Sequence, residues 1–144
     1  MDVQDHEAIE WALDATGLSG YRTRDIATLS GGQTQRVWIA MALAQETDIL
    51  ILDEPTTFLD PSHQLEILQL LTQINQIKQT TILMSIHDIN LASRFSDYLL
   101  GMKNGELITE GTPEEVINKR VYRKKYLRLM QRSSHYQKRI NQFF

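Results

Sequence analysis

The sequence predicts a layered α/β domain built on a largely parallel β-sheet. Amphipathic segments alternate with short apolar segments that stop at polar residues, and 144 residues is the length of one ordinary domain. No apolar run approaches the roughly 18 residues of a membrane span. The acidic start of the chain lacks the basic and apolar regions of a signal peptide, so we expect a cytoplasmic protein. The absence of cysteine excludes disulfide frameworks, thiolate zinc sites and cysteine nucleophiles.

The first third of the chain predicts two helices. The first spans residues 6–16, with Asp5 as its N-cap and Gly17 as a left-handed stop. The second spans residues 31–45, because its apolar residues recur at helical spacing on one face: Val37, Ala40, Met41 and Ala44.

Two short apolar segments predict strands. They are "DILIL", residues 48–52, and "TTILMSI", residues 80–86, and we expect both to be buried on both faces. Between them, Asp60 and Pro61 predict the N-cap and first position of a long helix. Its apolar residues also share one face: Ile67, Leu70, Leu71, Ile74 and Ile77.

The remaining elements are short. We expect a helix over residues 90–96 and a hairpin with a tight turn at Asn104 and Gly105. "TPEE", residues 112–115, matches a capping box that opens a terminal helix.

The charge divides sharply near residue 118. Residues 1–118 hold six Lys or Arg and all eighteen Asp and Glu, whereas residues 119–144 hold nine basic residues and no acid. This basic tail predicts a boundary. It has three interpretations: a shifted reading frame after about residue 122, a solvated helix, or a contact with nucleic acid or an acidic membrane surface.

Polar residues follow both predicted strands. Asp53 and Glu54 follow the first and His87 the second, and carboxyl ends of parallel strands share one edge, so these side chains should meet. The two acids either cap the next element or divide a task, in which one holds Mg²⁺ through water and the other polarises a water that attacks phosphorus. His87 is either a core histidine or a hydrogen-bond donor to a transferring phosphoryl group.

Two other features have a structural and a functional interpretation. Ser30 and Gln33 match a capping box, whereas Gly31 and Gly32 would also let an anion approach the helix start. Asp60 is foremost an N-cap, with a ligand contact as an additional role. The other histidines show no ligand spacing and are expected to be solvated: His6, His63 and His135.

Three motifs in order, "LSGGQTQR", "ILILDEPTTFLD" and "SIHD", resemble the ATP-binding cassette (ABC) family of ATPases. The flanking residues resemble nucleotide-binding subunits of iron-siderophore and cobalamin importers, and the resemblance covers about residues 1–122. It implies the C-terminal half of a P-loop NTPase (RecA-like) domain with part of the helical subdomain. Residues 1–45 would belong to that subdomain and residues 46–118 to the ATPase core.

The resemblance also implies roles for the residues above. The signature loop would contact the γ-phosphate of ATP held mainly by the other subunit of a head-to-tail dimer, and it comprises Ser30, Gly31, Gly32 and Gln33. Asp53 would orient Mg²⁺, Glu54 would be the general base and His87 would sense the γ-phosphate. Asp60 would lie in the loop that communicates across the dimer.

The implied partners are a second nucleotide-binding subunit and transmembrane permease subunits, with the protein peripheral on the cytoplasmic face of the membrane. No specific nucleic-acid partner is expected. The family's phosphate-binding string, Gly-x-x-x-x-Gly-Lys followed by Ser or Thr, does not occur in the sequence. We therefore expect a partial chain that neither binds Mg-ATP tightly nor hydrolyses it alone, with marginal stability and exposed apolar edges. A non-catalytic module that lends its signature loop to a complete subunit is the alternative, and chromosome-maintenance ATPases fit the flanking residues less well.

Overall fold

The computed structural model describes residues 3–118, which form two compact units divided after Asp88. The predictions for residues 119–144 and for His135 lie outside the described residues. Within the described chain, no helix is long and apolar enough to cross a bilayer. The proposed boundaries at residues 45/46 and 118/119 stay predictions.

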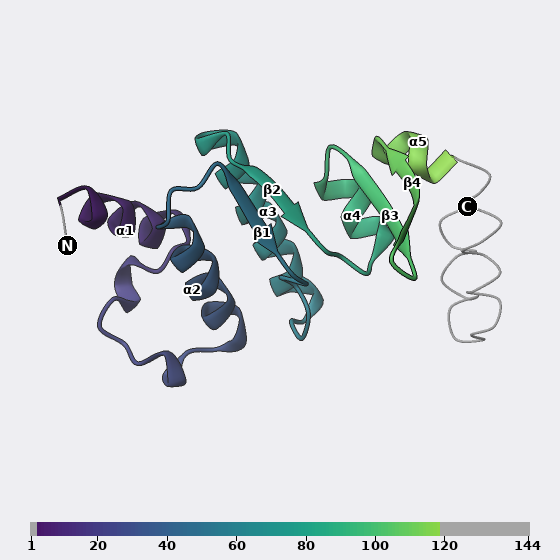
Figure 1. The fold of residues 1–144 in the computed structure, drawn as a ribbon. Coiled ribbons are helices and arrows are strands. Elements are labelled where there is room, and N and C mark those ends of the chain that lie inside the picture. Colours follow the sequence, from purple (N-terminus) through teal and green to yellow (C-terminus); the bar gives the residue numbers. More distant parts are fainter. Residues whose placement is uncertain (1–2, 119–144) are drawn as a thin grey trace. The chain divides into compact units, whose positions relative to one another are not determined.

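The first unit combines helices with a two-stranded parallel sheet (Figure 1). Strands β1 (Ile49–Leu52) and β2 (Thr81–Met84) pair in parallel, as predicted, through the crossover helix α3 (Pro61–Lys78). Two further helices precede β1, namely α1 (Val3–Ala15) and α2 (Gly31–Leu43), together with the short 3-10 turns η1 (Ser19–Tyr21) and η2 (Ile26–Thr28).

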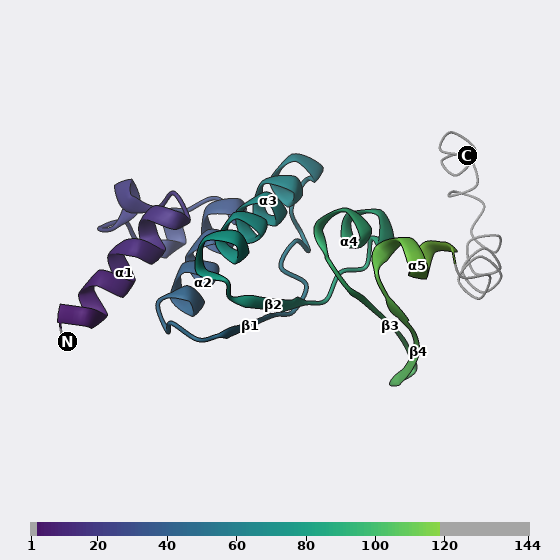
Figure 2. The same cartoon turned by 90° about the horizontal axis from the view of Figure 1, so that it is seen from above.

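The core of this unit lies between the helices and one face of the sheet. Leu50 of β1 turns inward to a buried cluster that α1, α2 and α3 share. Figure 2 shows α3 on one side of the β1–β2 ribbon only. The members of the cluster are Ala12, Leu18, Ile39, Ala40, Leu43, Leu50, Ile67, Leu70, Leu71 and Ile74.

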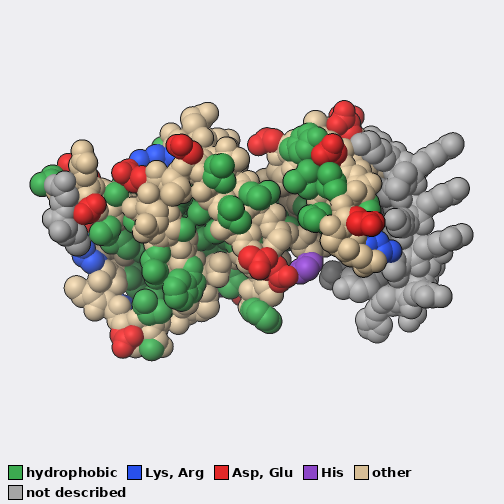
Figure 3. Space-filling view, viewed as in Figure 1, with side chains coloured by type: hydrophobic (Ala, Val, Ile, Leu, Met, Phe, Trp, Pro, Cys, Tyr) green, Lys and Arg blue, Asp and Glu red, His purple; other side chains and the backbone are tan. Residues whose placement is uncertain are grey.

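The prediction that both strands are buried on both faces is wrong. Ile51 is 72% exposed. Its neighbour Ile49 is more than half exposed, and its neighbour Leu83 is half exposed. Alternate residues of a strand point to opposite faces, and only one face carries a helical layer in the described chain. The result is an apolar outer face, visible as green side chains on the first unit in Figure 3.

Helix details also differ from the prediction. The first helix begins at Val3, so Asp5 lies in its first turn instead of capping it, although Gly17 is left-handed with φ +70° as expected. On α2, Met41 is exposed and Ile39 is buried instead, because packing against α1 and α3 decides which part of a broad apolar stripe faces inward. Ile77 of α3 is exposed for the same reason.

The second unit, described for residues 89–118, matches the prediction closely. Helix α4 (Ile89–Phe95) precedes an antiparallel hairpin of β3 (Leu99–Lys103) and β4 (Glu106–Gly111), and α5 (Pro113–Asn118) follows. The turn residues Asn104 and Gly105 both have positive φ, as a tight two-residue turn requires. Thr112 and Glu115 form the predicted capping box.

The one-sided core predicts contrasting costs for two truncations. Leu71→Ala removes a fully buried side chain and should lower the free energy of unfolding by about 2–5 kcal/mol. Ile51→Ala removes an exposed one and should change it by no more than about 1 kcal/mol. Urea unfolding of the two variants measures both values, and equal losses would contradict burial on one face only.

Candidate functional site

The carboxyl ends of β1 and β2 bring the predicted acids and histidine together. The backbone N–H of Ser85 donates to the carbonyl of Leu52 at 3.1 Å, which extends the parallel ladder to the strand ends. Residues after each strand therefore leave the sheet at one edge. There His87 Nε2 donates to Glu54 Oε1 at 2.5 Å, across 33 residues of sequence. The expected meeting of Glu54 and His87 is confirmed.

Ser85 joins the two acids, and sequence reasoning missed it. Its hydroxyl donates to Asp53 Oδ1 at 2.7 Å and accepts the backbone N–H of Glu54 at 2.8 Å. One oxygen thus fixes the carboxylate of Asp53 and the main chain of Glu54. The available signal was a hydroxyl residue directly after the second strand, at the same edge as the acids.

The carboxylate of Glu54 is held at both oxygens. Thr57 Oγ1 donates to Oε2 at 2.8 Å, opposite the His87 bond on Oε1. The hydrogen bonds from Thr57 and His87 lower the pKa of Glu54 below its ordinary value, so the group is ionised at neutral pH. Its backbone is left-handed, with φ +48°, which is uncommon for a residue other than glycine.

The start of α2 forms a second cluster. Gln33 N–H donates to Ser30 Oγ at 3.3 Å and Ser30 N–H donates to Gln33 Oε1 at 3.0 Å, so the capping-box interpretation is confirmed. The N–H groups of Gly31 and Gly32 have no acceptor inside the helix, because first-turn amides never do. Capping and anion binding are therefore compatible at this loop.

The start of α3 lies beside the start of α2. Asp60 caps α3 by accepting the backbone N–H groups of Ser62 and His63, both at 3.1 Å, which confirms it as the N-cap. His63 Nδ1 also donates to Asp60 Oδ2 at 2.7 Å. Hydrogen bonds from Ser62 and His63 lower the pKa of Asp60, and Asp60 raises the pKa of His63. His63 is exposed, as expected from the sequence, and the cap also holds its ring.

The eight predicted site residues fall into two groups in the first unit. Asp53, Glu54 and His87 lie together with Ser85 and Thr57, which we call the strand-end cluster. Ser30, Gly31, Gly32 and Gln33 lie at the α2 start. The ring of His63, which Asp60 holds, lies 3.0 Å from the position that a Cβ of Gly32 would take. Among the described residues, the strand-end cluster offers Asp53 and Glu54 as its carboxylates, and no group of three or more metal-binding side chains is present.

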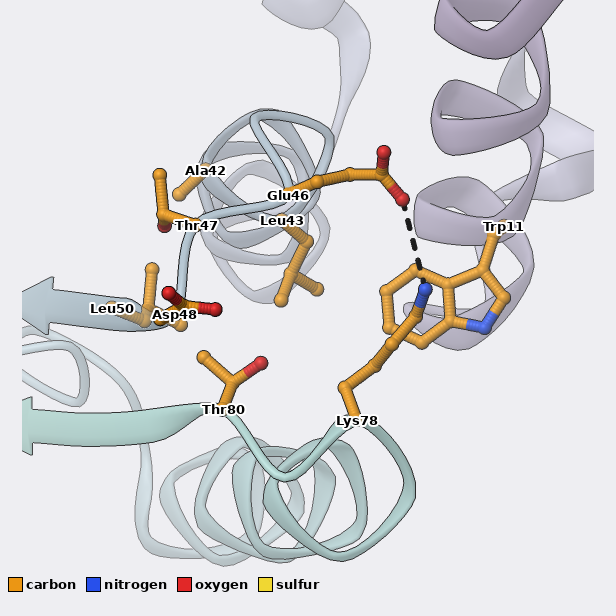
Figure 4. A pocket seen from close by; sticks show the side chains of 9 residues that line it. All are labelled: Trp11, Ala42, Leu43, Glu46, Thr47, Asp48, Leu50, Lys78 and Thr80. Atoms are coloured by element: carbon orange, nitrogen blue, oxygen red, sulfur yellow. Dashed lines mark ion pairs between the residues drawn. The ribbon is translucent and has the colours of Figure 1, made fainter.

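A separate pocket of about 150 Å³ lies at the opposite end of the sheet. Asp48 and Thr80, which directly precede the two strands, contribute to its lining. Figure 4 shows Lys78 between the Trp11 ring and Glu46. Lys78 Nζ lies 4.2 Å from the centre of the ring and 3.8 Å from Glu46 Oε1. Lys78 and Glu46 pair with one another, and Asp48 is the remaining charged side chain in the lining.

Comparison with known proteins decides the family. A family model described as "ABC transporter" matches residues 2–57. Over 114 residues, 79% of this chain, the sequence is 59% identical to the iron(3+)-hydroxamate import ATP-binding protein FhuC of Bacillus subtilis (strain 168). The chain belongs to the ABC transporter ATPase family. It spans 42% of the length of FhuC.

Solved ABC structures share the fold. The structure of cbiO1 from Clostridium perfringens, part of the ABC transporter complex cbiONQ, has a TM-score of 0.74 and 38% identity over 88% of this chain and 51% of that chain. A dimeric structure of MJ0796, a bacterial ABC transporter cassette, has a TM-score of 0.65 and 34% identity over 78% of this chain and 49% of that chain. The predicted α/β class and the predicted ABC resemblance are both confirmed.

The Asp60–His63 pair predicts a pH dependence of stability. A histidine whose folded pKa is raised contributes stability that is complete below its unfolded value of 6.5 and is lost as the pH rises through the folded pKa. The difference in urea midpoint between the wild type and His63→Gln should therefore shrink as the pH rises from 6 to above neutrality. Midpoints measured at intervals of about half a pH unit test this. His6→Gln, at an exposed histidine of α1, is the control. A difference that stays constant with pH would contradict the pairing.

Proposed function

We propose that the chain is part of the ATP-binding and ATP-hydrolysing subunit of an ABC importer for iron(III)-siderophores or related metal chelates. The observation that carries the ATPase proposal is the strand-end cluster, in which an ionised carboxylate, a second acid and a histidine meet after two parallel strands. The importer and its substrate class rest on the likeness to FhuC, whose name gives iron(3+)-hydroxamate import.

The residues suit Mg²⁺ only together with a nucleotide. Mg²⁺ in such sites keeps several waters and takes one or two carboxylates plus phosphate oxygens. Asp53, whose Oδ1 already accepts from Ser85, offers a fixed carboxylate of this kind, and no cluster of three metal-binding side chains is needed. When bound, Mg-ATP would supply the phosphoryl group and the metal that neutralises its charge.

Glu54 is the residue that would accept a proton from the attacking water. It is ionised at neutral pH, but His87 and Thr57 each occupy one of its oxygens in this structure. Each carboxylate oxygen has two lone pairs, so a further proton donor can share Oε2 with Thr57, share Oε1 with His87, or replace His87 there. The side chain of His87 is 81% exposed, so little packing would have to break for this bond to be exchanged. In this proposal His87 exchanges its bond to Glu54 for one to the γ-phosphate.

The signature loop and Asp60 would act toward a second nucleotide-binding subunit. Uncommitted N–H groups of the α2 start, together with the Ser30 hydroxyl, suit a phosphate oxygen. A head-to-tail dimer, permease partners and a place on the cytoplasmic face of the membrane complete the proposal. The dimeric MJ0796 cassette supports the two-subunit arrangement.

The 144-residue chain alone should show no ATP turnover and no tight Mg-ATP binding. Its sequence lacks the phosphate-binding string, and phosphate contacts supply most of the positioning and charge stabilisation in phosphoryl transfer. Phosphate release and calorimetric titration with Mg-ATP test this expectation. Turnover that disappears in Glu54→Gln would show that the chain is catalytic by itself.

The alternative is a non-catalytic module that lends its signature loop to a complete subunit. The observation that favours it is the α2 start, which is fully formed and capped in this chain. The test is titration of the chain into a complete ABC ATPase subunit whose own signature serine is replaced. A module should change ATP turnover, and Ser30→Arg should abolish the effect, whereas Glu46→Gln, at the distant pocket, should preserve it. No change in turnover would leave only the importer-subunit proposal.

A further inference from the structure

The first turns of α2 and α3 approach each other unusually closely at Gly32. A Cβ atom added at Gly32 would lie 3.0 Å from Cδ2 of His63, closer than an ordinary van der Waals contact, and 3.6 Å from its Cγ, an ordinary contact. The equivalent atom at Gly31 would meet only Leu59 Cδ2, at 3.9 Å. The two adjacent glycines therefore differ, since a methyl group fits beside Gly31, whereas at Gly32 it requires the His63 ring to give way by a few tenths of an ångström.

The ring of His63 is held by a hydrogen bond to the α3 cap. Nδ1 of the ring donates to Asp60 Oδ2, while Asp60 Oδ1 accepts the backbone N–H groups of Ser62 and His63 and the hydroxyl of Ser62. The cap that starts α3 thus also sets the orientation of the ring. The opposite edge of the ring, with Cδ2 and Nε2, faces the backbone of α2 at Gly32.

Backbone conformation does not explain the glycine. Gly32 is the second residue of α2 and, unlike Gly17, has no positive φ. Glycine is less favourable than alanine in a helix, because it loses more conformational freedom on folding. The close approach of the His63 ring is a second physical reason for glycine at this position, besides the approach of an anion.

One turn further along, the same two helices are joined by an ion pair. Arg36 Nη2 of α2 lies 3.1 Å from Glu66 Oε2 of α3. Asp60, Glu66 and Arg36 are the charged groups that act on His63, with Asp60 the strongest. The junction therefore consists of a close ring-to-backbone contact at the helix starts and a charge pair behind it.

We propose that His63 is a positioning residue that fixes the signature loop against the Asp60 cap, and that glycine at position 32 is required for this contact. The functional meaning rests on the proposed function, in which both the signature loop and Asp60 act toward a second subunit. Through His63, the two loops move as one body instead of separately. A shift of Asp60 would be transmitted to the backbone amides of the signature loop.

A double-mutant cycle in the full chain tests the contact. Gly32→Ala should lower the urea midpoint when His63 is present, because the new methyl group meets the ring. In the His63→Ala background the same change should raise the midpoint or leave it unchanged, because the space is open and alanine favours the helix. Equal shifts in both backgrounds would overturn the contact.

Gly31→Ala is the matched control, because its Cβ meets Leu59 at ordinary distance. It should shift the midpoint equally in both backgrounds, and a dependence on His63 would overturn the assignment to Gly32. Should His63→Ala leave too little folded protein, His63→Ser removes the ring but keeps a polar side chain beside Asp60. The same change of sign is then expected.

Two readouts separate positioning from a purely structural role. In NMR titrations of the wild type, the amide signals of Gly31 and Gly32 should follow the protonation of His63, and His63→Gln should abolish this titration. In the mixture with a signature-defective complete subunit, His63→Ala should reduce the effect of the chain by up to about a hundredfold. Amides that do not titrate, or an undiminished effect of His63→Ala, would overturn the positioning role. The mutant cycle and the NMR titration need no nucleotide, so they test the contact independently of the proposed function. A wild-type chain without effect on turnover would therefore count against the module function and not against the contact.

Discussion

The parallel pairing of β1 with β2 is the constraint on which the rest of the first unit depends. Parallel strands need a crossover connection, and α3 provides it while covering one face of the sheet with Leu71 and its neighbours. The same direction of both strands delivers the residues that follow them to one edge. Without this pairing, nothing in the local sequence would bring Glu54 and His87 together, since 33 residues separate them.

The backbone of Glu54 at that edge is strained, and neighbouring residues stabilise it. Glu54 adopts a left-handed backbone, which costs a non-glycine residue about 1–3 kcal/mol. The bond from its N–H to Ser85, the bond from Thr57 to its carboxylate and the buried Pro55 after it hold this conformation. A base whose direction is fixed in this way needs little reorganisation to act, which agrees with the proposed role of Glu54.

Capping residues at the helix starts serve two purposes that do not compete. A serine hydroxyl has one donor and two acceptor positions, so the cap made by Ser30 uses an acceptor and leaves the O–H to donate. Asp60 similarly uses one oxygen for the α3 cap and the other for His63. Structural and ligand-binding interpretations of these motifs are therefore compatible, and the motif alone could not decide between them.

The sequence by itself determined the order of elements, the parallel pairing and most helix starts, because these follow from local periodicity and capping chemistry. The Asp60–Pro61 start of α3 and the Asn104–Gly105 turn are examples. The motifs also determined the ABC family, since three of them occur in register between residues 29 and 88.

Only the tertiary structure decided which surfaces are buried and which side chains support the site. Ile51 belongs to an apolar segment typical of a central strand, but its side chain lies on an uncovered face of the sheet. Burial depends on the layers that pack against a sheet. No role was predicted for Ser85, although it opens the "SIHD" motif, or for His63. Their partners Asp53 and Gly32 lie 32 and 31 residues away in sequence. Contacts between such distant residues follow from packing, which the local sequence pattern does not contain.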